Sequence, residues 1–156
     1  MTEISRQELI ELQQDSHKLL SELVTSEGIY ASSNIGWEGP YYAWFGRDSS
    51  ITADFIFASL EYGGDRELAS VAIGALKSFA KWRGKKNDST TGEESGKIPH
   101  EIRVEFNSVH AVQHAARTNA QEWFIDPSDN TLKNWDTADA TSLWILAILR
   151  GHKQLD

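Results

Sequence analysis

The chain has 156 residues, of which 40% are hydrophobic and 24% are charged, and it contains no cysteine. These proportions exclude a wholly disordered chain, and the lack of cysteine excludes disulfides, thiolate metal sites and cysteine nucleophiles. The net charge of -8 argues against nucleic acid and anionic membranes as partners, because both require a basic surface.

Three helices are predicted in the first half of the chain. Leucines recur at helical spacing over 6–24, and this pattern indicates an amphipathic helix. Apolar residues show no regular spacing over 28–48, and this segment is rich in glycine and aromatic residues. It is therefore predicted to be a long loop. A second helix is expected to start near Asp48 or Ser49 and to end at Gly63 and Gly64. Asp65 then caps a third helix that reaches Trp82, and the short turn predicts antiparallel packing of the two.

The second half of the chain is predicted as loops and two further helices. Residues 83–98 are polar and predict a solvated loop, and 104–117 carry apolar residues at helical spacing. Residues 118–135 are expected to be a loop with a turn at 126–130. The last helix, at 137–150, is apolar nearly all round, which predicts that it is buried between other helices.

These patterns together predict an all-α fold built from helical hairpins, with long loops at one end. The few predicted helices cannot cover every side of the last helix. We therefore expect residues 1–156 to form one incomplete part of a larger helical domain. The first eight residues are polar, and the longest apolar run, at 143–149, is too short to cross a bilayer. We therefore expect no membrane partner and a cytoplasmic location.

A candidate sugar site begins in residues 41–48, Tyr-Tyr-Ala-Trp-Phe-Gly-Arg-Asp. Aromatic faces such as that of Trp44 contact the C–H surface of sugars, and Arg47 and Asp48 can bind adjacent hydroxyls. The alternatives are a plain N-cap for Asp48 and an ion-paired loop residue for Arg47.

Two further segments carry candidate polar groups. Residues 96–103, Gly-Lys-Ile-Pro-His-Glu-Ile-Arg, place Glu101 and Arg103 just before a predicted helix. Glu101 is suited to accept hydroxyls or to act as an acid or base, and the alternative is a charge-paired loop end. Residues 134–144 place Asp136 and Asp139 at the start of the last helix, where capping by Asp136 or Thr137 explains only one of the two acids.

Metal and cofactor chemistry receive little support from the sequence. His110 and His114 have the i, i+4 spacing of a metal pair, but no acid lies between them in the manner of a zinc protease. No phosphate-binding glycine loop and no nucleophile elbow is present. We therefore expect no metal site and no cofactor.

Three short sequence motifs, called phrases here, resemble motifs of one protein family and occur in the same order along the chain. They are Trp44-Phe45-Gly46-Arg47-Asp48-Ser49, then residues 96–103, then Asp136-Thr137-Ala138-Asp139-Ala140-Thr141-Ser142-Leu143-Trp144. They resemble the catalytic domain of amylo-α-1,6-glucosidase, the glycogen-debranching type of enzyme, and its six-hairpin glycosidase relatives. The resemblance covers residues 40–150.

The resemblance implies the N-terminal portion of an (α/α)6 barrel, or toroid, with a sugar site in the loops at one end. It implies a glycoside hydrolase that acts on α-glucosidic linkages of an oligosaccharide or α-glucan. It assigns substrate binding to Trp44, Arg47, Asp48, Glu101, Arg103 and Asp139. It assigns no catalytic residue to this chain, because the general acid and base of such enzymes usually lie on later hairpins, so whether this chain is itself an enzyme stays open.

Two other functions remain open at this point. One is a non-catalytic sugar-binding helical module that keeps the same site. The other is a helical interaction domain with no sugar site. Besides a sugar ligand, the further partners expected for this segment are the remainder of the barrel or a second copy of the chain.

Overall fold

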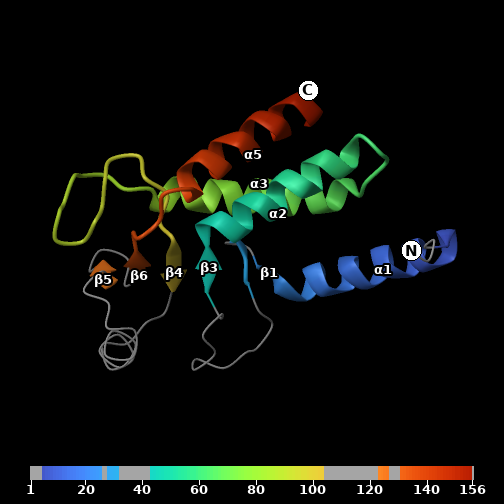
Figure 1. Ribbon diagram of the computed structural model, residues 1–156, viewed down its shortest axis with the longest axis horizontal. Helices are drawn as coiled ribbons and strands as arrows, with labels where there is room; N and C mark the ends of the chain where they lie inside the picture. The colour runs from blue at the N-terminus through green and yellow to red at the C-terminus, as the bar shows by residue number, and fades with distance from the viewer. Residues whose placement is uncertain (1–4, 26–27, 32–42, 104–122, 127–130, 156) are drawn as a thin grey trace.

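The computed structural model describes residues 5–25, 28–31, 43–103, 123–126 and 131–155. Four helices lie among these residues, α1 (Arg6–Leu23), α2 (Gly46–Leu60), α3 (Arg66–Trp82) and α5 (Ala140–Leu155). The described part of the chain is therefore mostly helical, as the sequence predicted (Figure 1). The helix predicted at 104–117 falls outside the described residues.

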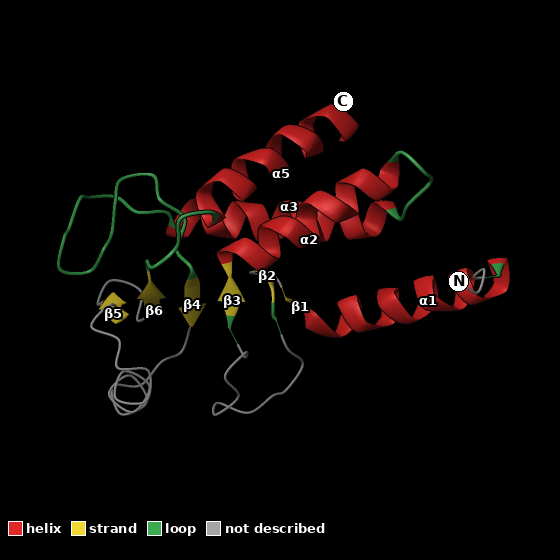
Figure 2. Ribbon diagram, in the orientation of Figure 1, coloured by secondary structure: helices red, strands yellow, loops and turns green. Residues whose placement is uncertain are grey.

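A small antiparallel sheet corrects the all-α prediction. It contains β3 (Trp44–Phe45), β4 (Glu101–Arg103), β6 (Thr131–Asn134) and β5 (Trp123–Asp126), in that spatial order. A separate pair joins β1 (Val24–Thr25) to β2 (Gly28–Ile29). The sequence predicted loops where β2 to β6 lie and the end of the first helix where β1 begins, because strands of two to four residues are too short to show the alternation of apolar and polar residues. Figure 2 shows the strands gathered at the end where α2 and α5 begin.

The helix boundaries follow local capping chemistry with one exception. Ser5 and Glu8 form a reciprocal capping box at the start of α1. Asp65 caps α3 as predicted, since its carboxylate accepts from the backbone N–H of Glu67 at 2.7 Å. The exception is α2, which begins at Gly46 rather than near Asp48 and has Phe45 at its N-cap without a side-chain hydrogen bond.

α2 and α5 are parallel neighbours. The contacts between them advance in the same direction along both helices. Asp54 accepts from the Arg150 guanidinium at 2.6 Å, and further along both helices Glu61 accepts from Gln154 at 2.5 Å. Between them, Gly151 packs against the ring of Phe57, where a Cβ atom would come within 2.7 Å of a ring carbon. In Figure 1, α1 and α3 run opposite to α2 and α5, so the four described helices include two of each direction.

α5 is only partly buried, which corrects the prediction that other helices cover it. Its residues Ala140, Ala147 and Gly151 are buried, and Ala147 packs in the core between α2 and α3. The opposite face is exposed to solvent and comprises Ile145, Leu146, Ile148 and Leu149. The described residues provide no second layer over this apolar stripe. Within the described ranges, no helix is long and apolar enough to cross a membrane.

Gly46 is the point where three distant segments meet. A Cβ atom on Gly46 would lie 2.3 Å from the carbonyl oxygen of Pro99 and 2.9 Å from the Ile98 side chain. It would also lie 3.4 Å from the Cβ atom of Ala140, at the start of α5. Only glycine permits this approach, because real side chains do not tolerate a contact of 2.3 Å with a backbone atom.

Gly46→Ala should therefore destabilise the protein by about 2–3 kcal/mol, since the Pro99 carbonyl belongs to the backbone and must move. Gly74→Ala is the matched control, because Gly74 lies inside α3 with no atom within 4 Å of an added Cβ. The control should stabilise the protein by about 1 kcal/mol through helix propensity. Urea denaturation of both variants measures the difference, and equal effects of the two substitutions would contradict the close approach at Gly46.

Candidate functional site

The sheet brings together the three phrases that the sequence singled out. β3 pairs with β4 so that Phe45 lies opposite Glu101, and β4 pairs with β6 so that Glu101 lies opposite Asn134. The backbone continues these links just outside the strands. Gly46 N–H donates to the His100 carbonyl at 2.9 Å, and His100 N–H donates to the Asn134 carbonyl at 2.7 Å. The starts of α2 and α5 are thereby fixed beside the Glu101 segment.

Trp44 belongs to the core and not to an open sugar-binding surface. Only 2% of its surface is exposed. Its ring stacks on Tyr30 at 4.8 Å and on Trp82 at 5.2 Å, with interplanar angles of 21° and 22°. Because aromatic rings stack against it in this way, the indole presents no open face to a sugar. Its role is to anchor β3 against α3.

Arg47 and Asp48 lie exposed in the first turn of α2. Their side chains are 46% and 49% exposed, and Arg47 Nε lies 4.0 Å from Asp48 Oδ1. Neither alternative from the sequence describes them well. Asp48 is not the N-cap, and a 4.0 Å contact between exposed groups is a weak ion pair. A guanidinium and a carboxylate therefore stand side by side with their polar atoms available to a ligand.

Glu101 and Arg103 form a buried ion pair on β4. Arg103 Nε donates to Glu101 Oε1 at 2.6 Å, and the two side chains are 10% and 7% exposed, respectively. Burial raises the pKa of Glu101 to about 7, and the charge and hydrogen bond of Arg103 oppose this rise without cancelling it. Near neutral pH the Glu101 carboxyl therefore exists in both protonation states, which suits a group that accepts or donates a hydrogen bond.

Asp139 immediately precedes α5. Its carbonyl accepts from the backbone N–H of Leu143 at 3.0 Å, and its exposed carboxylate accepts from the Thr137 hydroxyl at 2.9 Å. Thr137 also caps the helix, since its hydroxyl oxygen accepts from Ala140 N–H at 3.3 Å. Asp136 takes no part in this cap and instead donates its backbone N–H to the Asn134 side chain at 2.7 Å. Of the two residues that the sequence offered as caps, Thr137 is the one that caps α5. Its hydroxyl also orients the carboxylate of Asp139.

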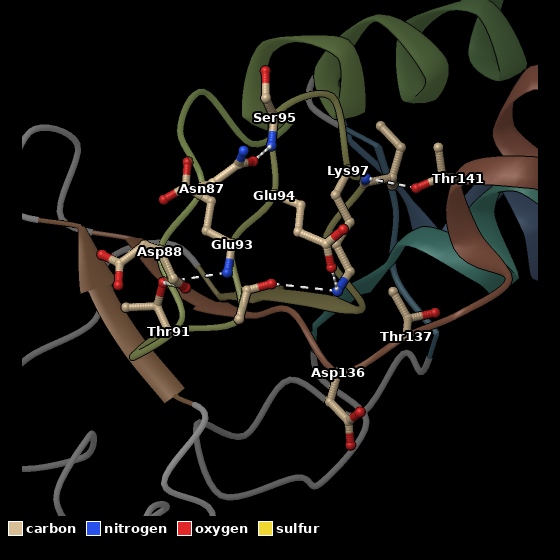
Figure 3. Close-up of polar contacts among 12 residues, drawn as sticks. Asn87, Asp88, Thr91, Glu93, Glu94, Ser95, Lys97, Asp136, Thr137 and Thr141 are labelled. Carbon is tan, nitrogen blue, oxygen red and sulfur yellow. Dashed lines mark hydrogen bonds and ion pairs between the residues drawn. The ribbon is translucent and has the colours of Figure 1, made fainter.

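Two residues that sequence reasoning did not assign hold the segments in place. Thr141 Oγ1 accepts from the backbone N–H of Ile98 at 2.9 Å, and Asn134 supports both His100 and Asp136. Thr141 lies within one of the three phrases. Its hydrogen bond with Ile98 (Figure 3) could not be predicted, because the two residues are far apart in the chain.

Metal ligation finds no support in the described part of the chain, which holds no cluster of three or more His, Asp or Glu side chains able to bind an ion. The pair His110 and His114 falls outside the described residues.

Comparison with known proteins adds no relative. No protein-family model, no curated protein and no solved structure matches this chain. The functional argument therefore rests on the residues themselves and on their arrangement.

The raised pKa of Glu101 has a measurable effect on stability. Below pH 4.5 the carboxyl is protonated in both the folded and the unfolded protein. As the pH rises toward 7, the unfolded chain releases the proton first, so the folded state loses about 3 kcal/mol of stability through this one group. Glu101→Gln removes the titration.

Urea denaturation at pH 4.5, 6 and 8 should therefore show the Glu101→Gln variant gaining stability relative to the parent protein as the pH rises. A difference between the two proteins that stays constant over this range would show that the pKa of Glu101 is not raised.

Proposed function

We propose that this chain is the part of an α-glycoside hydrolase that holds the terminal sugar of its substrate. One observation carries the proposal. The three phrases that resemble six-hairpin glycosidases meet at one place, through the β3–β4–β6 pairing and the close contact of Gly46 with Pro99 and Ala140. Arg47, Asp48 and Asp139 all follow from this junction at the starts of α2 and α5.

The helix directions support an incomplete (α/α)6 barrel as the fold. In such a barrel the inner helices are parallel to one another and the outer helices run the opposite way. α2 and α5 are parallel and in close contact, which fits two inner helices, whereas α1 and α3 run the other way and fit outer ones (Figure 1). The exposed apolar stripe of α5 then fits the surface that a neighbouring hairpin would cover.

The proposed chemistry is recognition of vicinal hydroxyl groups. Arg47 offers planar N–H donors, and Asp48 and Asp139 offer acceptors, so that together they complement a pair of hydroxyls on a neutral sugar. The Thr137 hydroxyl orients the carboxylate of Asp139 at 2.9 Å. Glu101 and Arg103 are assigned to the wall of the same site, where Arg103 holds the Glu101 carboxyl in place. The expected ligand is the non-reducing end of an α-linked oligosaccharide or glucan.

The hydrolytic step itself is assigned to groups other than these. Inversion at a glycosidic bond requires two carboxyl groups roughly 6.5–9.5 Å apart with a water between them. Arg47 and Asp48 are adjacent, and their pairing suits binding more than proton transfer. The proposal therefore places the general acid and the general base outside the residues that form this binding site.

A second candidate is a helical interaction domain, and the observation that favours it is the exposed apolar stripe of α5. This candidate requires no sugar site. Tryptophan fluorescence that responds to a partner protein but to no mono- or disaccharide would support it over the glycosidase proposal.

The sugar site is tested by Asp48→Ala. Loss of one charged hydrogen-bonding group should weaken binding of methyl α-glucoside about tenfold or more. The effect on stability should stay below about 1 kcal/mol, because an exposed acid in the first turn contributes only through the helix dipole. Titration calorimetry measures the affinity, and urea denaturation measures the stability.

Glu67→Ala is the matched control, since Glu67 is an exposed acid in the first turn of α3 and also follows an arginine. This control should leave the sugar affinity unchanged. Equal affinity of the Asp48→Ala variant and the parent protein, or no binding of any α-glucoside to the parent, would overturn the proposal.

A further inference from the structure

α1 is an amphipathic helix whose leucines remain in solvent. None of its residues is buried, whereas α2, α3 and α5 each bury several. Leu9, Leu12 and Leu19 are 52%, 61% and 59% exposed. In Figure 1, α1 lies at the margin of the molecule, beyond α2. These leucines therefore form an apolar surface that no other described element covers, and a surface of this kind marks an interaction site.

The spacing of the leucines is that of a contact between two helices. Leu9, Leu12, Ser16, Leu19 and Leu23, called here the α1 seam, follow one another at intervals of three, four, three and four residues. They occupy alternate a and d positions of a heptad repeat, which line one side of a helix and insert between the side chains of a facing helix. The repeat therefore favours another α-helix as the partner.

One flank of the α1 seam is uniformly acidic. Glu8, Asp15 and Glu22 follow one another at intervals of seven residues, so all three take the g position beside the seam, and all three are exposed. The e positions on the other flank, Arg6, Gln13 and Leu20, carry no acid. Charges at e and g set the choice of partner in paired helices, so a partner with Lys or Arg along its own flank is favoured.

The acidic flank disfavours two other occupants of the seam. In an antiparallel pair with α1 of a second copy, the g positions would face each other and the acidic rows would repel. In a parallel pair, the acids would face Gln13 and Leu20 and gain no attraction. Each copy also carries a net charge of -8. A membrane surface is disfavoured because amphipathic helices that bind lipid carry Lys and Arg on the polar face.

Contacts on the inner side of α1 orient the helix. His17 Nε2 lies 3.4 Å from Asp65 Oδ2, at the start of α3. Ile10 and Leu20 line a space that they share with Leu68 of α3. Because these residues face α2 and α3, the acidic row of α1 lies on the outer side of the helix, with the exposed leucines beside it.

We infer that α1 binds a basic amphipathic helix of a partner protein. The α1 seam packs against the apolar side chains of that helix, and Glu8, Asp15 and Glu22 face its Lys or Arg side chains. The inference is independent of the proposed function, because α1 contributes no residue to the proposed sugar site. It is also compatible with the proposed barrel, in which α1 is an outer helix.

The probe is a fluorescent synthetic helix of about four heptads, with leucine at the a and d positions and lysine at e and g. A second peptide has glutamate in place of each lysine. Fluorescence anisotropy measures the binding of each peptide to the full chain at about 0.1 M salt, where long-range attraction is screened. The parent protein should bind the lysine peptide at least about tenfold more tightly than the glutamate peptide.

The Leu12→Ala/Leu19→Ala variant tests the α1 seam. It should bind the lysine peptide at least about tenfold more weakly, because less apolar surface is buried in the contact. Alanine preserves the helix, which circular dichroism checks. Leu146→Ala/Leu149→Ala is the matched control, since it makes the same change at leucines of α5 that are 56% and 59% exposed. The control should stay within about twofold of the parent affinity.

The Asp15→Lys/Glu22→Lys variant tests the acidic flank. It should reverse the preference, so that the glutamate peptide binds more tightly than the lysine peptide. Glu8 is left in place because it completes the capping box at the start of α1. Glu67→Lys/Glu94→Lys is the matched control, because it changes the net charge equally at two exposed acids outside α1. This control should keep the preference for the lysine peptide.

Equal affinity for the two peptides, or no binding of either, would overturn the inference. So would a loss of binding or of preference in the control variants as large as that in the α1 variants. Sedimentation velocity and flotation with phosphatidylcholine vesicles test the other occupants. Self-association or vesicle binding of the parent that Leu12→Ala/Leu19→Ala abolishes would assign the seam to a second copy or to lipid, and would also overturn the inference.

Discussion

The contact of Gly46 with the Pro99 carbonyl is the constraint on which the rest of the arrangement depends. It allows the first turn of α2 to pack against the loop residues Ile98 and Pro99, which precede β4, and against the first turn of α5. The hydrogen bond from Gly46 N–H to His100 then sets the register of the β3–β4 pair, and Thr141 closes the other side by accepting from Ile98. A larger side chain at position 46 would separate all three segments at once, and with them the polar groups that each one carries.

The same junction explains how exposed and buried charges come to lie near one another. Arg47 and Asp48 project from a helix start where no side chain serves as the cap, so they remain accessible. One strand away, Glu101 lies in a dry environment where desolvation outweighs the attraction of Arg103. Under the proposed function, the accessible groups of Arg47 and Asp48 would bind sugar hydroxyls, and Glu101 would form part of the wall beside them.

The helical layer gives the junction its rigidity. α2 and α5 approach closely because small residues, Ala53, Ala147 and Gly151, line their contact and leave room for the ring of Phe57. Trp144 adds a long-range tie by donating its indole N–H to the Leu76 carbonyl at 3.0 Å. The apolar residues on the opposite face of α5, Ile145, Leu146, Ile148 and Leu149, are exposed, so α5 has one packed face and one apolar face that no other described element covers.

The sequence by itself determined the helices of the described region, the antiparallel turn between α2 and α3, and the Asp65 cap, because these depend on interactions within a few residues. It also singled out Arg47, Asp48, Glu101, Arg103 and Asp139 as polar residues at the ends of predicted segments. Only the tertiary structure decided that β3, β4 and β6 pair, since strands so short have no periodicity to detect. Only the tertiary structure placed Trp44 in the core and Thr141 against Ile98, because burial and partners at long range depend on which segments meet in space.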